Sequence, residues 1–401
     1  MAQTSRAKKA ARSGSREDRI SALPDDVLHH VLGFLPAEEA VQTSILARRW
    51  RHLSRSMRRL CLTDESRHWN ADELNEFMNS LLLLRDPSVA LDEVKFTETE
   101  SHFCNRDTYI DTWIRHVLFC QARVLSIVPC HAEGNLVLYG SPLVAQHLQK
   151  LEFAYVDLRR SFLDFASCPQ LMDLKITYCT IYCDRILSKS IKHLSITHSS
   201  MHCKQIHISV PGLISLQLYE YRFRTPLLDD MPSLETAIFS FGSRDYCKKA
   251  ASVGLCICAK CWDDTDQNRN SILLGGLSSA MDLELICNSG TLIFSAWCPT
   301  FSKLKTLLLH VPHKFNDLQL IVCILEHSPV LEKLTLRVPK VLECARESVS
   351  SYHPMEQLSA ISKYLNTVEI KCGEVDERVC RILKLLSRFV KHINIDLIDE
   401  P

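Results

Sequence analysis

Glycine is scarce in this chain, at 11 of 401 residues. This scarcity argues against a glycine-rich nucleotide-binding architecture, and the chain has no phosphate loop, nucleophile elbow or His-Glu metal-binding pair. No uninterrupted apolar stretch reaches the ~20 residues that a membrane-spanning helix needs. The segment 1–19 is polar and basic rather than a secretory hydrophobic segment. These absences predict a soluble intracellular protein, in the nucleus, the cytoplasm or both, without a catalytic centre or a cofactor.

The 18 cysteines lack the spacing of a disulfide framework, and in an intracellular protein they are expected to be reduced thiols. Cys258 and Cys261 form one CxxC pair, with Cys256 and Cys247 upstream. A structural zinc site needs four Cys or His ligands, usually in two close pairs, and no second pair follows nearby. We therefore expect no metal site and keep Cys258 and Cys261 as a minor alternative. The 17 histidines are dispersed.

Net charge is also absent, because 47 Lys and Arg balance 47 Asp and Glu. The balance is uneven: residues 1–60 hold 12 basic and 6 acidic residues, and the remainder holds 35 and 41. The basic end could touch nucleic acid or assist nuclear import. A disordered, solvated basic tail over residues 1–18 is the simpler interpretation, so nucleic acid is not the expected partner.

Residues 19–60 carry the most specific pattern. Two Leu-Pro steps, at 23–24 and 35–36, each open an apolar run with helical spacing, and a basic segment with Trp50 follows. Pro24 suits the first turn of a helix, and the two aspartates after it place negative charge at the positive end of the helix dipole. Forty residues are too few to bury a core alone. The segment is therefore predicted to be a docking module that a partner completes.

The runs 20–28 (Ile-Ser-Ala-Leu-Pro-Asp-Asp-Val-Leu) and 40–51 (Ala-Val-Gln-Thr-Ser-Ile-Leu-Ala-Arg-Arg-Trp-Arg) resemble the F-box of the plant F-box/leucine-rich-repeat family. The resemblance implies a three-helix F-box over 19–60 that grips a Skp-type linker and, through it, a cullin. It assigns the fold and the linker-binding surface to Leu23, Pro24, Leu28, Val31, Leu32, Leu35, Val41, Ser44, Leu46, Trp50 and Leu53.

Two positions of this chain depart from the family pattern. Members of the family often have Ser where Ala47 stands and Trp where Ser54 stands. A lost Ser cap costs about 1 kcal/mol of helix stability, and a lost Trp removes apolar area. Linker binding weaker than is usual for the family is therefore expected.

Beyond residue 60 the chain repeats the pattern L-x-x-L-x-L, with aliphatic or aromatic substitutes. Copies start at 148, 171, 191, 213, 234, 280, 304, 331, 365 and 390, and weaker copies start at 57, 91 and 122. Spacing near 20 to 29 residues is that of leucine-rich repeats, and segments such as 328–334 also resemble the family's repeats. Because Leu-x-Leu places two side chains on one face of a strand, only neighbouring copies can cover each apolar face.

The predicted fold class is therefore α/β: a short three-helix F-box followed, over 61–401, by a curved leucine-rich-repeat solenoid with a parallel sheet on its concave side. Helices are expected at 72–84, at 107–120 and, near the C-terminus, at 374–389. The segment 242–279 breaks the regularity and is predicted to be an irregular repeat with an enlarged loop.

Substrate binding would fall on the concave sheet, on the residues that alternate with the core leucines. The candidates are Lys175, Thr177, His193, Ser195, Gln217, Tyr219, Lys333 and Arg337. Their charges are mixed, so a ligand of one sign, such as a polyphosphate, is not indicated. Tyr219 and Arg337 are the preferred anchors, because Tyr and Arg dominate interface hot spots.

The leading hypothesis is a non-catalytic substrate receptor of an SCF-type cullin ubiquitin ligase. Its F-box would dock the Skp-type linker, and its repeats would bind the protein to be ubiquitinated. Two alternatives stay open: a non-degradative interaction scaffold, and a nucleic-acid-associated or zinc-containing regulator. The substrate itself is not encoded in any motif of the sequence.

Overall fold

The computed structural model describes residues 20, 22–63, 71–97, 107–129, 135–139, 142–159, 162–203, 206–220, 226–241, 274–287, 298–311, 319–340 and 361–398. The predicted tail 1–18, the Cys258/Cys261 pair and most of the predicted loop 242–279 lie outside these residues.

Short helices form the N-terminal end of the described chain: α1 (Asp25–Leu32), α2 (Ala37–Gln42), the 3-10 helix η1 (Thr43–Ile45) and α3 (Arg48–Arg55). A proline in extended conformation stands at the N-cap of α1 and of α2, and acidic residues fill both first turns. These signals start each helix where the two Leu-Pro steps predict it. The inner faces bury Leu28, Leu32, Trp50 and Leu53, which belong to a core continuous with that of the rest of the chain.

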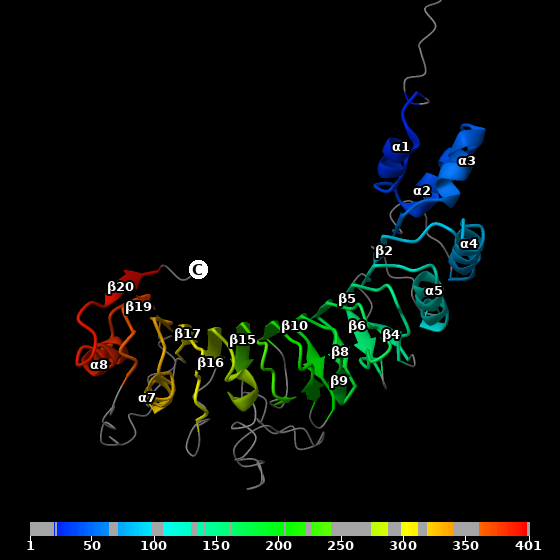
Figure 1. Cartoon of the computed structure of the whole chain (residues 1–401). Helices are drawn as coiled ribbons and strands as arrows, with labels where there is room; N and C mark the ends of the chain where they lie inside the picture. The colour runs from blue at the N-terminus through cyan, green and yellow to red at the C-terminus, as the bar shows by residue number, and fades with distance from the viewer. Residues whose placement is uncertain are drawn as a thin grey trace, which may run out of the picture.

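One parallel sheet of thirteen strands runs from the N-terminal helices to the C-terminal end. Its strands, in spatial order, are β1 (Arg59–Leu62), β2 (Glu93–Thr97), β3 (Val124–Val128), β5 (Lys150–Ala154), β7 (Asp173–Thr177), β10 (His193–Thr197), β13 (Ser215–Tyr219), β15 (Thr236–Phe241), β16 (Asp282–Cys287), β17 (Thr306–His310), β18 (Lys333–Val338), β19 (Thr367–Cys372) and β20 (Asn394–Leu397). Figure 1 shows these strands along the inner side of an arc, with the N-terminal helices at one end.

The repeat pattern explains the register of this sheet. The two inner apolar positions of each copy are the alternating buried residues of its strand, as Leu174 and Ile176 are in β7. Equivalent positions of the repeat pair between neighbouring strands: Leu151, Leu174, Leu194 and Leu216 are successive partners. The sheet is therefore a stack of apolar rows that only adjacent repeats can cover.

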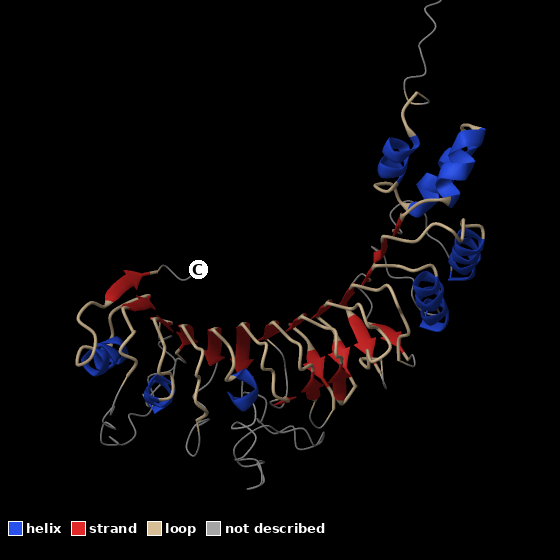
Figure 2. Ribbon diagram, in the orientation of Figure 1, coloured by secondary structure: helices blue, strands red, loops and turns tan. Residues whose placement is uncertain are grey.

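The convex side carries the remaining elements (Figure 2). Two narrow parallel sheets lie there, one of β4 (Leu136–Leu138), β6 (Val156–Leu158), β8 (Thr180–Ile181) and β11 (Ser200–Met201), the other of β9 (Arg185–Leu187), β12 (His207–Ser209) and β14 (Leu227–Leu228). In other repeats a helix connects one strand of the large sheet to the next. These helices are α4 (Ala71–Leu83), α5 (Asp107–Phe119), α7 (Gln319–Glu326) and α8 (Glu377–Leu386).

The predicted fold class is confirmed: helices at the N-terminal end are followed by a curved solenoid whose parallel sheet lines the concave side. Strand β1 begins at Arg59, inside the segment 19–60, so the sheet starts directly after α3. None of the described helices is both long and apolar enough to cross a membrane.

Candidate functional site

Six large apolar side chains of the N-terminal helices face solvent. They are Leu23, Val27, Val31, Phe34, Ile45 and Leu46, with exposed fractions between 36% and 82%. We call them the N-terminal apolar set. Val27 and Val31 lie on one face of α1, and Leu23 and Phe34, just before and just after the helix, continue the same spacing of three or four residues. Because α1 already buries Leu28 and Leu32, it is apolar on two faces, and its outer face lacks a covering element among the described residues.

The predicted linker-binding residues divide into three groups in the structure. Leu28, Leu32, Trp50 and Leu53 are buried, so they hold the helices together. Leu35, Val41 and Ser44 are half-buried. Leu23, Pro24, Val31 and Leu46 are exposed and form the outer surface. The linker-binding residues predicted from the sequence did not include Val27, Phe34 and Ile45, although all three are exposed. The helical spacing of Val27 and Phe34 with Val31 could have indicated that they belong to the same surface.

Arg49 joins α3 to the start of α1. Its guanidinium donates to the carboxylate of Asp25 through Nε (2.7 Å) and Nη2, and Nη2 also donates to the carbonyl oxygen of Leu23 (2.7 Å). A second link runs between His29 Nε2 and Ser56 Oγ (2.9 Å). These contacts fix the Leu23-Pro24 step, which carries part of the exposed apolar face.

The two departures from the family pattern have a clear place in the structure. Ala47 is the N-cap of α3, with extended φ and ψ of −159° and 159°, and no side chain caps this helix. Ser54 is buried, and its hydroxyl donates to the carbonyl oxygen of Arg51 (3.1 Å). Position 47 is thus the site at which a Ser would accept hydrogen bonds from the first backbone N–H groups of α3.

A buried arginine connects the N-terminal helices to the solenoid. Arg85, only 7% exposed, donates to the carbonyl oxygens of Met57 (2.5 Å) and Val89 (3.0 Å). Next to it, the backbone N–H of Asp86 donates to the carbonyl oxygen of Arg55 (3.0 Å). Burial lowers the pKa of the Arg85 guanidinium. The junction is therefore held by hydrogen bonds at the point where α3 leads into β1.

The concave sheet brings together six of the eight predicted substrate-binding residues. Lys175, Ser195 and Gln217 are successive partners on β7, β10 and β13, and Thr177 and Tyr219 flank Thr197 in the next row. His193 begins β10 and is exposed. Lys333 and Arg337 lie on β18, four strand spacings from β13, which at about 4.8 Å each amounts to roughly 19 Å. The candidates thus form two separate groups on one face.

Polar side chains bridge the strands within each group. The ammonium of Lys175 donates to Glu152 (2.8 Å), and the hydroxyl of Ser195 donates to Gln217 (2.9 Å). Burial alone would raise the pKa of Glu152, but the hydrogen bond and charge of Lys175 outweigh it, so the pKa is lowered. In the second group, Lys333 lies 3.2 Å from Glu369 and lowers the pKa of that carboxyl group.

The stretch of sheet between the two groups is partly apolar. Ile238, Glu284 and Leu308 are successive partners in the middle of β15, β16 and β17, and both apolar side chains are half-buried. His310 Nε2 lies 2.8 Å from Glu284, and its strand partner Arg337 is exposed. An apolar centre with a polar and basic margin matches the anatomy of protein–protein interfaces. Sequence reasoning missed Ile238 and Leu308, because the alternation of each strand leads one to expect polar residues at outward positions.

The comparisons with known proteins concern the N-terminal helices first. The model of the F-box domain matches residues 20–62. The N-terminal helices thus form an F-box domain. Over nearly its full length the chain is similar to two curated plant proteins, at 26% identity to each. The match to the meiotic F-box protein MOF of Oryza sativa subsp. japonica spans 88% of this chain and 80% of that protein. The match to the F-box/FBD/LRR-repeat protein At5g22660 of Arabidopsis thaliana spans 89% of this chain and 84% of that protein.

A shorter match is closer in sequence. The F-box/LRR-repeat protein At4g14103 of Arabidopsis thaliana is 43% identical over 79 residues, which is 20% of each chain. The resemblance to the plant F-box/leucine-rich-repeat family is thus confirmed. F-box domains generally bind Skp1-type linkers, and proteins that combine them with leucine-rich repeats generally act as non-catalytic adaptors.

The solenoid of this F-box protein also displays stacked rings at the end of the concave strands. Tyr155, Tyr178, His198 and Glu220 directly follow four successive strands, each in left-handed conformation with φ between 48° and 55°. The rings of Tyr155 and Tyr178 stack at 5.1 Å, those of Tyr178 and His198 stack at 4.7 Å, and the ring of Tyr219 meets His198 edge-on at 5.7 Å. We call these four rings the aromatic ladder. It borders the first concave group and ends at Tyr219, whose pKa is raised by its hydrogen bond with Glu220.

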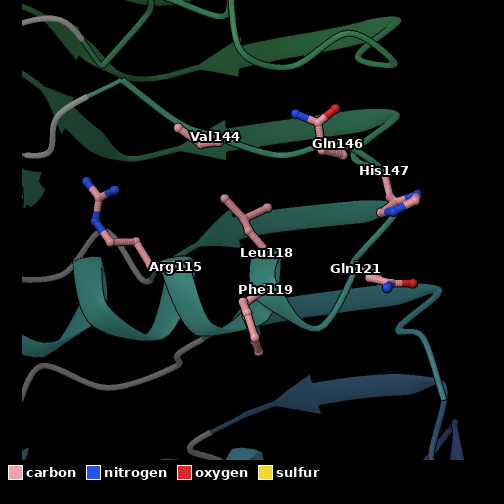
Figure 3. Close-up of a pocket in the computed structure, with 7 residues that line it drawn as sticks. All are labelled: Arg115, Leu118, Phe119, Gln121, Val144, Gln146 and His147. Carbon is pink, nitrogen blue, oxygen red and sulfur yellow. The ribbon is translucent and has the colours of Figure 1, made fainter. Parts of the chain in front are cut away.

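A hollow of about 420 Å³ on the convex side is lined by the polar residues Arg115, Gln121, Gln146 and His147 as well as by apolar ones (Figure 3). Leu118 and Phe119 of α5 face Val144 across it, while Arg115 and His147 lie at opposite ends. Small-molecule sites usually have a few polar groups that converge on the ligand. This hollow instead supplies exposed apolar side chains, Phe119 and Val144, which serve below as controls.

Proposed function

We propose that this F-box protein is the substrate-receptor subunit of an SCF-type cullin ubiquitin ligase. Its F-box docks a Skp-type linker and, through it, a cullin, while its solenoid binds the protein that is ubiquitinated. The receptor itself carries no catalytic role; it raises the rate by holding the substrate near the ubiquitin-charged enzyme. The chain acts inside the cell, in the nucleus, the cytoplasm or both.

One observation carries the proposal: α1 is apolar on its buried face and on its exposed face. A helix of this kind in a water-soluble protein needs a second covering partner. The matched F-box residues 20–62 include the whole N-terminal apolar set, so a linker of the Skp type is the partner that fits.

The solenoid supports the other half of the proposal. Its concave face presents the apolar centre of Ile238 and Leu308 between Tyr219 and the basic pair Lys333 and Arg337. A face about four strands wide can accept a folded protein or an extended segment of one. The substrate that this surface favours combines an apolar centre with acidic residues opposite Arg337.

Linker binding is tested by co-purification with a Skp-type linker. The variants Leu23→Ala with Pro24→Ala, and Val31→Asp with Phe34→Ser, change exposed residues and should reduce affinity about tenfold or more while the chain stays folded. Phe119→Ser with Val144→Ser removes apolar side chains that are even more exposed, from the convex hollow, and should leave binding unchanged. Failure of the wild type to bind, or full binding by both F-box variants, would overturn the receptor role.

Substrate capture is tested separately by proximity labelling in cells. A chain with Val31→Asp and Phe34→Ser should retain substrates that are otherwise degraded, and Leu308→Glu with Arg337→Glu should lose them while still binding the linker. Partners whose half-lives do not change with or without this chain would favour the non-degradative scaffold instead.

A further inference from the structure

A cluster of two cysteines and one histidine lies on the convex side, away from both proposed surfaces. Cys298 precedes β17, and Cys323 and His327 lie one turn apart in and just after α7. One sulfur or nitrogen atom of each residue lies within 4.8 Å of the other two. Cys298 is 7% exposed, and the other two residues are half-buried. The cluster is therefore partly shielded from solvent, and solvent can still reach two of its three residues.

The ligand types and their spacing suit a thiophilic cation. Zinc bonds to cysteine sulfur at about 2.3 Å and to histidine nitrogen at about 2.0 Å, so tetrahedral ligands lie about 3.5–3.8 Å apart. A contraction of about 1 Å would bring the widest pair of this cluster to that distance. Three protein ligands with a fourth position for water form a known type of zinc site, which sequence spacing does not reveal when the ligands come from different elements.

The two thiols of the cluster are hydrogen-bonded to one another. Elsewhere in the described chain, Cys168 and Cys183 donate to single carbonyl oxygens, of Leu143 and Leu158. Cys298 instead has a second sulfur as its neighbour, which is the arrangement that a metal ion can bridge.

One hydrogen bond holds the ring of His327. Its Nδ1 lies 2.8 Å from the carbonyl oxygen of Cys323, and because a carbonyl oxygen only accepts, Nδ1 carries the proton and Nε2 the lone pair. Metal-bound histidines commonly use such a hydrogen bond to fix the ring and its tautomer. The backbone also joins the two segments: the N–H of Phe301 donates to the carbonyl oxygen of His327 (2.8 Å).

We propose that Cys298, Cys323 and His327 bind one Zn²⁺ ion, with water in the fourth position. Binding releases the thiol protons to solvent and links α7 to the segment before β17. The ion thus stabilises the repeat that leads into β18, independently of the function proposed above. The weak candidate pair Cys258 and Cys261 plays no part in it.

Metal analysis of the full-length chain, purified under reducing conditions, tests the site. About one zinc per chain should remain after dialysis, and Cys298→Ser, Cys323→Ser and His327→Gln should each lower zinc affinity by more than about tenfold, since even outer-shell partners are worth that much. Two matched controls, Cys258→Ser with Cys261→Ser and the exposed Cys380→Ser, should retain zinc.

A second measurement keeps the result clear if a variant does not fold. Titration of the wild type with Co²⁺ should give sulfur-to-cobalt charge-transfer absorption, and Zn²⁺ should protect the Cys298 and Cys323 peptides from alkylation. The site is overturned if the wild type neither holds nor takes up zinc, if protection falls on Cys258 and Cys261 alone, or if mass spectrometry finds a Cys298–Cys323 disulfide under these conditions.

Discussion

The guanidinium of Arg49, on α3, donates to the carboxylate of Asp25, in the first turn of α1, and to the carbonyl oxygen of Leu23. The ion pair is partly exposed, with side-chain exposures of 37% and 62%, so its own contribution to stability is about 0.5 kcal/mol. Its larger effect is positional, because it holds the chain that carries Leu23 and Pro24 against α3.

Arg49→Lys should therefore weaken linker binding more than it weakens the fold. A lysine keeps the charge but cannot contact Asp25 and the Leu23 carbonyl in the same forked geometry. We expect a several-fold loss of linker affinity and a change in unfolding free energy below about 1 kcal/mol. Calorimetric titration and urea unfolding measure the two effects. The matched control is Arg51→Lys, on the exposed side of the same helix; equal losses in both variants would contradict the positional role.

Ala47→Ser should strengthen the F-box. Ala47 already has the extended backbone of an N-cap, so a Ser hydroxyl can accept from the N–H groups of the first turn of α3 without rearrangement. The expected gain is about 1 kcal/mol in unfolding free energy, with tighter linker binding if folding of α3 limits affinity. Ala47→Val, which adds no acceptor, is the control. A Ser variant no more stable than the Val variant would show that this end of α3 is satisfied in another way.

Arg85→Met tests the junction between the F-box and the solenoid. The change keeps much of the side-chain length but leaves the buried carbonyl oxygen of Met57 and the half-buried one of Val89 without this donor. Each unsatisfied group costs about 1–3 kcal/mol, so a loss of roughly 2–6 kcal/mol is expected in chemical unfolding. Arg123→Met, at an exposed arginine of the neighbouring repeat, should cost less than about 1 kcal/mol.

The repeat pattern predicted the strands well because it contains two constraints at once. In Leu171-x-x-Leu174-x-Ile176, the spacing of two places side chains on one face, and the outer leucine marks the turn; β7 begins at Asp173 as that pattern requires. The helices expected at 72–84 and 107–120 agree with α4 and α5 within one residue at each end. Periodicity was sufficient there because packing on neighbouring repeats follows the same period.

The candidate sites were less predictable, because they depend on which apolar faces stay uncovered and on contacts between repeats. Periodicity shows that Val27 and Leu28 are both apolar, but only the packing of α1 shows that one is exposed and the other buried. Likewise, Cys298 and Cys323 are 25 positions apart, and their contact depends on how α7 packs against the segment before β17.

The pair Glu152–Lys175 predicts a specific response to acid. The folded-state pKa of Glu152 lies below its ordinary value of 4.5, so the carboxylate contributes stability above that pH and loses it as the pH falls through the lower folded value. Glu152→Gln should therefore destabilise the protein at pH 7 and flatten the loss of stability between pH 7 and about pH 4. Urea unfolding at both pH values measures this, and an acid response as steep as that of the wild type would contradict the assignment.

Two substitutions of Tyr178, in the aromatic ladder, distinguish the energy of ring stacking from the energy of backbone strain. Removal of its ring should cost about 0.5–1.5 kcal/mol for each of its two ring partners, Tyr155 and His198. Its φ of 53° also disfavours every residue with a Cβ, by roughly 1–2 kcal/mol relative to glycine. Tyr178→Gly should therefore be more stable than Tyr178→Ala by about 1 kcal/mol, although glycine is normally the more destabilising residue in a folded chain. Urea unfolding of both variants tests this: if alanine is the better replacement, the left-handed turn after β7 is not kept in the protein.

The same pair of changes at Tyr182, which follows β8 and stacks on His202, is the control. It should show the ordinary order, with the alanine variant more stable than the glycine variant.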